Sequence, residues 1–173
     1  MRTVILETER LALRVMRPED CVPLSQILSD SETMSYYPQP YDTEGVREWI
    51  VRNVSRHALY GGGLWAMVLR KSGEVVGDCG LTFQQAGDRW ELEVGYHVNR
   101  RCWGQGLATE AARACLDYGF AHYSVSRLIA LIRPENRASC RVAEKNGMRI
   151  VEEIRRAGLA HYVYAVTRGA AGS

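Results

Sequence analysis

The chain reads EVGYHVNRRCWGQGLA from residue 93 to residue 108, and this segment joins a predicted strand to a predicted helix. Residues 90–98 alternate in polarity, as the residues of a half-buried strand do. After the segment, apolar side chains recur at helical spacing, and a compact β-branched strand follows at 127–133. A strand, a helix and a strand in this order make a crossover. We therefore expect the strands around Gly95 and Ile129 to be parallel neighbours.

Outward from this crossover, the hydrophobic pattern predicts an α+β domain with a mixed sheet. Residues 34–41 hold two prolines and three tyrosines and cannot form a regular helix. A turn is expected at 71–74, with Gly73 where positive φ is needed. The pattern predicts further strands at 6–15, 64–70, 75–82, 149–156 and 161–168, and helices that begin near residues 17, 43 and 138.

The composition is that of an ordinary globular protein. The chain has 173 residues, 46% of them hydrophobic, and a formal net charge of +2. We expect a single domain at 1–168 and a small polar, disordered tail at 169–173. The low net charge gives no sign of a nucleic-acid or membrane surface, and no segment approaches the roughly 18 apolar residues of a membrane-spanning helix.

The N-terminal segment and the cysteines bear on where the protein is found. Acidic residues interrupt the first 14 positions, where a signal peptide would be apolar. The five cysteines are scattered and form neither a disulfide framework nor a Cys/His cluster. We therefore expect a reduced, cytoplasmic protein without a bound metal.

The turn between strand and helix is a candidate phosphate site. Gly104 and Gly106 let backbone N–H groups converge at the positive end of the helix that follows. The lysine and hydroxyl of a P-loop are absent, and Thr109 stands where a dinucleotide fingerprint has its third glycine. Taken alone, the two glycines fit a phosphate site and an ordinary helix start equally well.

Three blocks of the sequence resemble the GCN5-related N-acetyltransferase (GNAT) superfamily. The first is 93–108, where Arg101, Gly104 and Gly106 match its Arg/Gln-x-x-Gly-x-Gly/Ala pattern. The second is PENRASCRVAEKNGM at 134–148, and the third is ETERLALR at 7–14. Together they are similar to the branch of ribosomal-protein N-terminal acetyltransferases (RimJ/RimL type). The resemblance covers about residues 6–167.

The resemblance implies the GNAT fold, a mostly antiparallel twisted sheet with one splayed parallel pair and about four helices. It implies acetyl-CoA as cosubstrate, held between the splayed strands, and a bulge in the strand 91–98 that lets backbone groups pair with pantetheine. The implied cofactor-binding residues are Tyr96, His97, Val98, Arg101, Trp103, Gly104, Gln105, Gly106, Leu107, Ala108, Asn136 and Ser139. Asn136 is also a good helix N-cap, and the two roles can coexist.

The same resemblance implies an N-acetyltransferase in which a primary amine attacks the thioester directly in a ternary complex. Glu93 stands where the branch has a glutamate, which would take the ammonium proton. Ser139 stands where the branch has a serine, which would hydrogen-bond the departing thiolate. A backbone N–H near Val98 would polarise the thioester carbonyl. Each of these residues also has a structural alternative. Glu93 fits an exposed glutamate on a strand, and Ser139 fits a hydroxyl in the first turn of a helix. The side chain of His97 fits a surface or core residue better than a base.

The acceptor is left open by the resemblance. The candidate acceptor-binding residues are Tyr36, Tyr37, Tyr41 and Glu91, the last being a reserve for Glu93. The branch slightly favours a protein or peptide N-terminus over a small-molecule amine or a polyamine. We expect a monomer or homodimer without nucleic-acid or membrane partners. Two other classes stay open, a non-catalytic acyl-CoA-binding sensor or partner domain and a nucleotide-phosphate-binding module.

Overall fold

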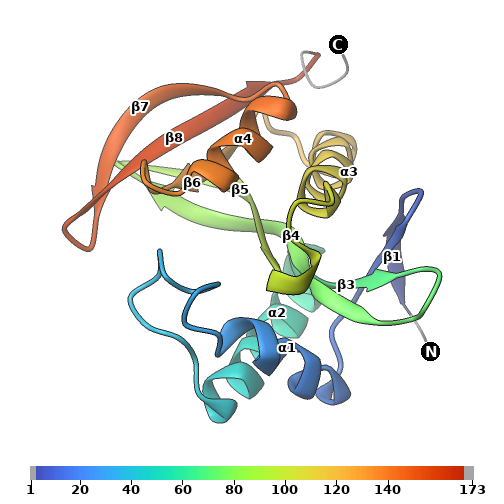
Figure 1. Cartoon of the computed structure of the whole chain (residues 1–173). Helices are drawn as coiled ribbons and strands as arrows, with labels where there is room; N and C mark the ends of the chain where they lie inside the picture. Colours follow the sequence, from blue (N-terminus) through green and yellow to red (C-terminus); the bar gives the residue numbers. More distant parts are fainter. Residues whose placement is uncertain (1–2, 170–173) are drawn as a thin grey trace.

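The computed structural model describes residues 3–169, which form one eight-stranded sheet with the order β1-β2-β3-β4-β5-β6-β8-β7 (Figure 1). The strands are β1 (Val4–Glu7), β2 (Leu11–Arg14), β3 (Gly63–Leu69), β4 (Val75–Ala86), β5 (Arg89–Val98), β6 (Arg127–Ile132), β7 (Arg149–Arg156) and β8 (Leu159–Thr167). The helices are α1 (Cys21–Leu28), α2 (Thr43–Tyr60), α3 (Leu107–His122) and α4 (Arg137–Lys145), with 3₁₀ turns at Pro18–Asp20 and Arg100–Cys102. Paired strands are antiparallel except β5 and β6, which are parallel. The predicted α+β class and mixed sheet are confirmed.

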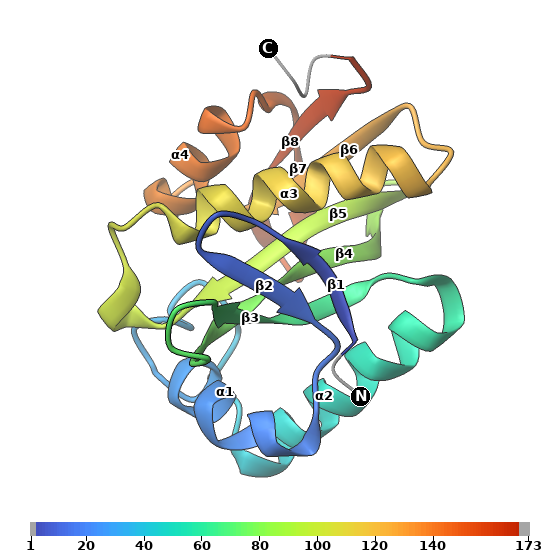
Figure 2. The ribbon, with the colours of Figure 1, turned by 90° about the vertical axis from the view of Figure 1, so that its right-hand side faces the viewer.

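Two helical layers cover the sheet. Helices α3 and α4 pack on one face, and α1 and α2 on the other (Figures 1 and 2). Leu64 and Trp65 are neighbours in β3 and point into different cores, because successive side chains of a strand face opposite sides. Cys115 of α3 belongs to the larger core with Trp65, and Val46 of α2 belongs to the smaller core with Leu64.

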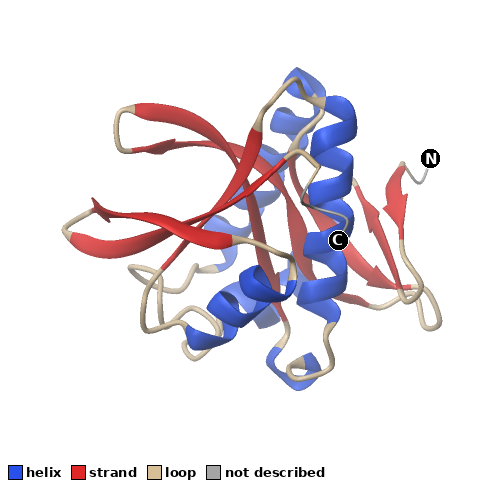
Figure 3. Cartoon of the chain, turned by 90° about the horizontal axis from the view of Figure 1, so that it is seen from above, coloured by secondary structure: helices blue, strands red, loops and turns tan. Residues whose placement is uncertain are grey.

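The sheet divides between β5 and β6. These strands share a single pairing, Glu93 with Ile129, and then separate. Strand β6 instead stays paired with β8 over its whole length, from Arg127 to Ile132. Seen from above, the strands fan apart (Figure 3). Because β6 follows β8, no strand within residues 3–169 covers the far edge of β5 beyond Glu93.

The bulge expected in the strand 91–98 is not found. Strands β4 and β5 pair without a register shift from Gly77–Val98 to Ala86–Arg89. The backbone edge of β5 is exposed because β6 diverges from it, so no bulge is needed to leave these groups unpaired.

The prediction of one strand over 6–15 is wrong, because the chain turns at Thr8. The Thr8 hydroxyl accepts a hydrogen bond from the Leu11 N–H (3.0 Å), and the Thr8 N–H donates to the Leu11 carbonyl (2.8 Å). Such local bonds compete with the extended chain. They separate β1 from β2, and the two strands pair as a hairpin.

The other elements differ from the prediction mainly at their ends. Helix α2 continues to Tyr60 and ends at Gly61, which has a φ of 76°. The predicted tail lies outside the described residues apart from Gly169. Within residues 3–169, no helix has both the length and the apolar character to cross a membrane.

Candidate active site

A cleft of about 590 Å³ opens where β5 and β6 separate. Its walls come from the end of β5, the turn into α3, the start of α4, and the connection between α1 and α2. Of the residues predicted for the site, the cleft is lined by Tyr36, Tyr37, Tyr96, His97, Val98, Trp103, Gly104, Gly106, Leu107, Ala108, Asn136 and Ser139. The fold therefore brings together residues from three distant parts of the sequence.

The backbone of β5 forms one wall. The Asn99 N–H donates to the Val76 carbonyl at 2.8 Å, and backbone groups alternate in direction along a strand. Those of Tyr96 and Val98 therefore point away from β4, into the cleft, and those of His97 point toward β4. The sequence placed the His97 backbone against the cosubstrate, whereas its N–H and carbonyl face β4.

The glycine turn forms the second wall. Gly104 and Gly106 have φ angles of 75° and 78°, a region where other residues are strained. Gly106 is the N-cap of α3 and supplies no side-chain hydrogen bond, so the first N–H groups of the helix stay available at its positive end. The Trp103 indole donates to the Val98 carbonyl at 2.8 Å, which leaves the Val98 N–H for a ligand.

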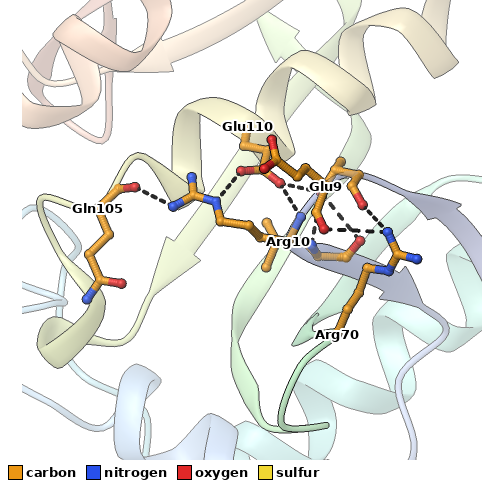
Figure 4. A network of polar contacts seen from close by, with 7 residues as sticks. Glu9, Arg10, Arg70, Gln105 and Glu110 are labelled. Carbon is orange, nitrogen blue, oxygen red and sulfur yellow. Dashed lines mark hydrogen bonds and ion pairs between the residues drawn. The ribbon is translucent and has the colours of Figure 1, made fainter.

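The turn between β1 and β2 contacts the glycine turn (residues 104–106) through Arg10 and supports it (Figure 4). Arg10 donates through Nη1 to the Gln105 carbonyl (2.8 Å) and through Nε to Glu110 Oε2 (2.7 Å). The Thr8 hydroxyl donates to Glu110 Oε1 at 2.5 Å. Burial raises the pKa of Glu110, but the hydrogen bonds from Thr8 and Arg10 bring this pKa below its usual value. Arg70 in turn donates to the Thr8 carbonyl at 2.7 Å.

The first turn of α4 forms the third wall. Asn136 Oδ1 accepts a hydrogen bond from the Ser139 N–H at 3.2 Å and so caps the helix. The Tyr96 hydroxyl donates to the Ser139 carbonyl at 3.3 Å and ties β5 to α4. Burial raises the pKa of Tyr96 well above its ordinary value, so this hydroxyl stays protonated as a donor.

Glu93 lies where the sheet divides. Its Oε2 is buried, and none of the described residues gives it a hydrogen bond, so it is not the exposed strand glutamate of the alternative prediction. Its Oε1 lies over Gly95, where a methyl side chain would come within 3.6 Å of it. Burial raises the pKa of Glu93 to about 7, although the charges of Arg156 and Arg56 act in the opposite direction. The carboxyl group therefore changes charge near neutral pH.

The sequence analysis missed one ionisable residue at the site. Asp78 of β4 is fully buried and lies directly opposite His97 of β5. Its Oδ1 lies 2.7 Å from His97 Nδ1, and its Oδ2 accepts the Trp49 indole N–H at 2.9 Å. The signal was present in the two-residue turn at 87–88, because counting back from a tight hairpin turn pairs residue 78 with residue 97.

Aromatic side chains surround this pair. The His97 ring lies 5.0 Å from the Tyr37 ring and 5.8 Å from the Trp49 ring, measured between centroids. Tyr41 packs on Trp49 at 5.7 Å and is not part of the cleft lining. Burial, together with the negative charges of Glu93 and Asp78, raises the pKa of Tyr37 well above its ordinary value.

Three other predicted site residues have their side chains elsewhere. Glu91 is ion-paired with Arg127 of β6. Arg101 is ion-paired with Glu74, and the Gln105 side chain donates to the Arg101 carbonyl at 3.4 Å. In the part of the chain that the structure describes, no group of three or more His, Cys, Asp or Glu residues could hold a metal ion.

Comparison with known proteins identifies the family. Residues 10–149 match the model of the acetyltransferase (GNAT) domain. The chain is 43% identical to the uncharacterized protein YkkB of Bacillus subtilis (strain 168), over 87% of this chain and 88% of that one. It is 33% identical to the uncharacterized N-acetyltransferase p20 of Bacillus licheniformis, over 79% and 78% of the two chains.

Solved structures agree with this match. The crystal structure of a GNAT-family acetyltransferase from Bacillus anthracis has a TM-score of 0.80 and 29% identity, over 96% of this chain and 98% of that one. RimL, a ribosomal L7/L12 alpha-N-protein acetyltransferase (18% identity, TM-score 0.80), and the aminoglycoside acetyltransferase AAC(6')-Ib with coenzyme A (21%, 0.77) share the fold. The chain belongs to the GNAT family of N-acetyltransferases.

Proposed function

We propose that this protein transfers the acetyl group of acetyl-CoA to a primary amine and binds acetyl-CoA in the cleft between β5 and β6. The observation that carries the proposal is the unpaired backbone edge of Tyr96 and Val98 beside the two left-handed glycines at the start of α3. An extended pantetheine arm fits such an edge as an added strand would. A pyrophosphate fits the N–H groups at the start of α3. AAC(6')-Ib, which shares the fold, was solved with coenzyme A.

The walls of the cleft have separate roles in this proposal. The N–H groups from Gly104 to Ala108 hold the pyrophosphate, while the Trp103 N–H is already used by the Arg100 carbonyl at 3.1 Å. The side-chain NH₂ of Asn136 donates to the pantetheine arm while its Oδ1 caps α4. The Val98 N–H donates to the thioester carbonyl and stabilises the negative charge that develops on its oxygen.

Glu93 and Ser139 carry the proposed chemistry. A carboxylate with a pKa of about 7 takes a proton from the acceptor ammonium at neutral pH, directly or through a water molecule. The uncharged amine then attacks the thioester carbon, the carbon–nitrogen bond forms and the carbon–sulfur bond breaks. The Ser139 hydroxyl hydrogen-bonds the departing thiolate. Amine and thioester react directly in a ternary complex.

For the acceptor, we propose a protein or peptide N-terminus first and a small-molecule amine or a polyamine second. The resemblance to the RimJ/RimL branch supports the first, and RimL itself is a structural neighbour. AAC(6')-Ib, which was solved with ribostamycin and coenzyme A, supports the second. Tyr36 and Tyr37 line the cleft on the side of the α1–α2 connection and are the proposed acceptor contacts. The cytoplasmic location remains a prediction from the sequence.

A thermal-shift titration with acetyl-CoA, beside ATP and NAD at matched concentration, tests the proposed cosubstrate. A ligand that binds only the native state at about 100 times its Kd adds roughly 2.7 kcal/mol to the free energy of unfolding. We expect a rise in Tm with acetyl-CoA alone. No shift with acetyl-CoA overturns the proposal, and a shift with ATP and NAD as well indicates a general nucleotide-phosphate module.

Turnover separates an enzyme from a non-catalytic acyl-CoA sensor. Release of the CoA thiol is followed with a short peptide that has a free N-terminus, with spermidine and with paromomycin. We expect amine-dependent thiol release with at least one of them. Binding of acetyl-CoA without turnover on any primary amine would favour the sensor.

A further inference from the structure

The proposed roles of Glu93 and Ser139 leave the buried pair Asp78–His97 without a function. His97 is among the residues that line the cleft, yet it is only 8% exposed. Its Nδ1 is bonded to Asp78, and its Nε2 is buried with no hydrogen-bond partner within residues 3–169. A buried polar atom without a partner is costly and points to a ligand.

The partners of Asp78 fix the tautomer of His97. Asp78 Oδ2 already accepts the Trp49 indole N–H, and Oδ1 lies 2.7 Å from His97 Nδ1. An ionised carboxylate can only accept hydrogen bonds, so Nδ1 carries the proton and Nε2 carries the lone pair.

His97 and Glu93 lie on the same face of β5, because they are four positions apart and side chains of a strand alternate between its faces. Between them stands Gly95, which has no side chain to block the path, and Glu93 Oε1 lies over it. Tyr37 packs on the His97 ring and is within electrostatic reach of both Glu93 and Asp78. Two proton acceptors thus stand on one side of the sheet, next to the proposed acceptor contacts.

We propose that His97, oriented by Asp78 and Trp49, is a second catalytic base for the acceptor amine. This inference rests on the proposed function. An ammonium nitrogen carries three protons and the amide product keeps one, so two must leave. Glu93 takes the first before attack. His97 Nε2 takes the second as the carbon–nitrogen bond forms and the carbon–sulfur bond breaks. The overall reaction balances, because the thiolate takes up one proton to become the thiol and one proton is released to water.

The ionisable groups around His97 come from several elements. Asp78 contacts it from β4 and Tyr37 from the α1–α2 connection, while Trp49 of α2 brings no titratable group. Glu93 lies farther along β5. The lining of the cleft includes further charged residues, which are Glu32, Glu135, Arg137, Arg141 and Lys145. Among these groups, within residues 3–169, Asp78 alone hydrogen-bonds the imidazole.

The test compares His97→Gln, Asp78→Asn and the control His122→Gln, an exposed histidine on α3. Each variant is assayed for kcat/KM from about pH 5.5 to about pH 9 with the fastest amine of the panel. Two bases that must both be unprotonated give a limiting slope of about 2 in log(kcat/KM) toward low pH. We expect His97→Gln to lower kcat/KM by about 10²-fold and the slope to about 1.

The other variants separate the base from its support. Asp78→Asn is expected to lower kcat/KM by about 10-fold through misorientation of His97, and His122→Gln to match the unaltered enzyme. The acetyl-CoA-induced shift in Tm should persist in all three. An unchanged rate and pH profile in His97→Gln, with an active unaltered enzyme, overturns the role of His97 and leaves the proposed function intact.

A measurement on the unaltered protein covers the case in which the buried variants do not fold. ¹⁵N NMR of the imidazole nitrogens reports which one carries the proton, and it needs no acceptor. We expect Nδ1–H with an unprotonated Nε2 at high pH, and protonation of Nε2 as the pH falls. A neutral Nε2–H tautomer would overturn the proposal, because Nε2 would then have no lone pair for a proton.

Discussion

Glu93 is a single residue whose environment sets a pH dependence. Its Oε2 is buried without a partner, and burial raises its pKa to about 7. Below this pH the carboxyl group is protonated and cannot accept a proton, so we expect kcat/KM to fall as the pH drops through about 7. Glu93→Gln should lower kcat/KM by about 10²-fold in the thiol-release assay. The control Glu153→Gln, an exposed glutamate of β7, should not.

The raised pKa of Glu93 also predicts that the stability of the folded protein falls as the pH rises, whereas kcat/KM is expected to rise with pH. The pKa of Glu93 is raised from 4.5 in the reference state to about 7 in the folded protein. The folded state therefore binds the extra proton, and its contribution is full below pH 4.5 and lost as the pH rises through about 7. Glu93→Gln should raise Tm at about pH 8 and leave it nearly unchanged near pH 5. A lower Tm at pH 8 would contradict the unpartnered burial of this carboxylate.

Asn136 has one role visible in the structure and one proposed, and two substitutions separate them. Asn136→Asp keeps an N-cap acceptor for the Ser139 N–H but removes the NH₂ donor, whereas Asn136→Ala removes both. We expect Asn136→Ala to lower the free energy of unfolding by about 1 kcal/mol, while Asn136→Asp changes it little. Both should raise the KM for acetyl-CoA. If Asn136→Asp keeps the KM of the unaltered protein, Asn136 is a helix cap only.

At the scale of elements, the β1–β2 turn supports the start of α3 through Arg10 (Figure 4). Arg10→Ala removes the hydrogen bond to the Gln105 carbonyl and the ion pair with Glu110. The turn at Gly104 and Gly106 is then less restrained and samples more conformations. We therefore expect a several-fold higher KM for acetyl-CoA with kcat nearly unchanged. Steady-state kinetics measure both. Arg47→Ala, an exposed residue of α2, is the matched control, and an equal effect in both variants would contradict the role of Arg10.

The elements also show what the sequence could predict. The parallel placement of β5 and β6 follows from chain order, because a strand, a helix and a strand leave few topologies. The turn at Thr8 was missed because the apolar alternation continues across it, and the deciding interaction is a side-chain hydroxyl on a backbone N–H. The bulge in β5 was expected by resemblance, but the divergence of β6 depends on its pairing with β8, a strand that comes later in the chain.

The residues of the candidate site also differ in how far the sequence could predict them. Glu93, Asn136 and Ser139 could be named from local motifs, since each lies within a short recognisable block. Asp78 could not, because it enters the site only through its pairing with His97 across a hairpin and through a hydrogen bond from Trp49 of α2. The register of the β4–β5 hairpin connects Asp78 with His97, whereas Trp49 reaches Asp78 only through the packing of α2.

At the scale of the whole molecule, the sheet consists of two parts, β1–β5 and β6–β8, that meet at a single parallel pairing. The core around α3 also joins them, because it includes Leu92 of β5 and Leu128 of β6. An ion pair between Glu91 and Arg127 spans the same junction, just before the strands separate. The position of the cleft walls therefore depends on a few contacts at its closed end.

This arrangement predicts the effect of removing Arg127. Arg127→Met leaves the Glu91 side chain, which is 9% exposed, with only Arg89 at 3.5 Å as an ionic partner. We expect the free energy of unfolding in urea to fall by about 1–3 kcal/mol, because a partly buried acceptor loses its donor. Glu91→Gln combined with Arg127→Met should recover part of this loss, since no charge is then left unpaired. Arg47→Ala, which breaks an exposed pair with Glu44, should change stability by less than about 1 kcal/mol. If Arg127→Met is as stable as the unaltered protein, the α3 core alone holds the two parts of the sheet together.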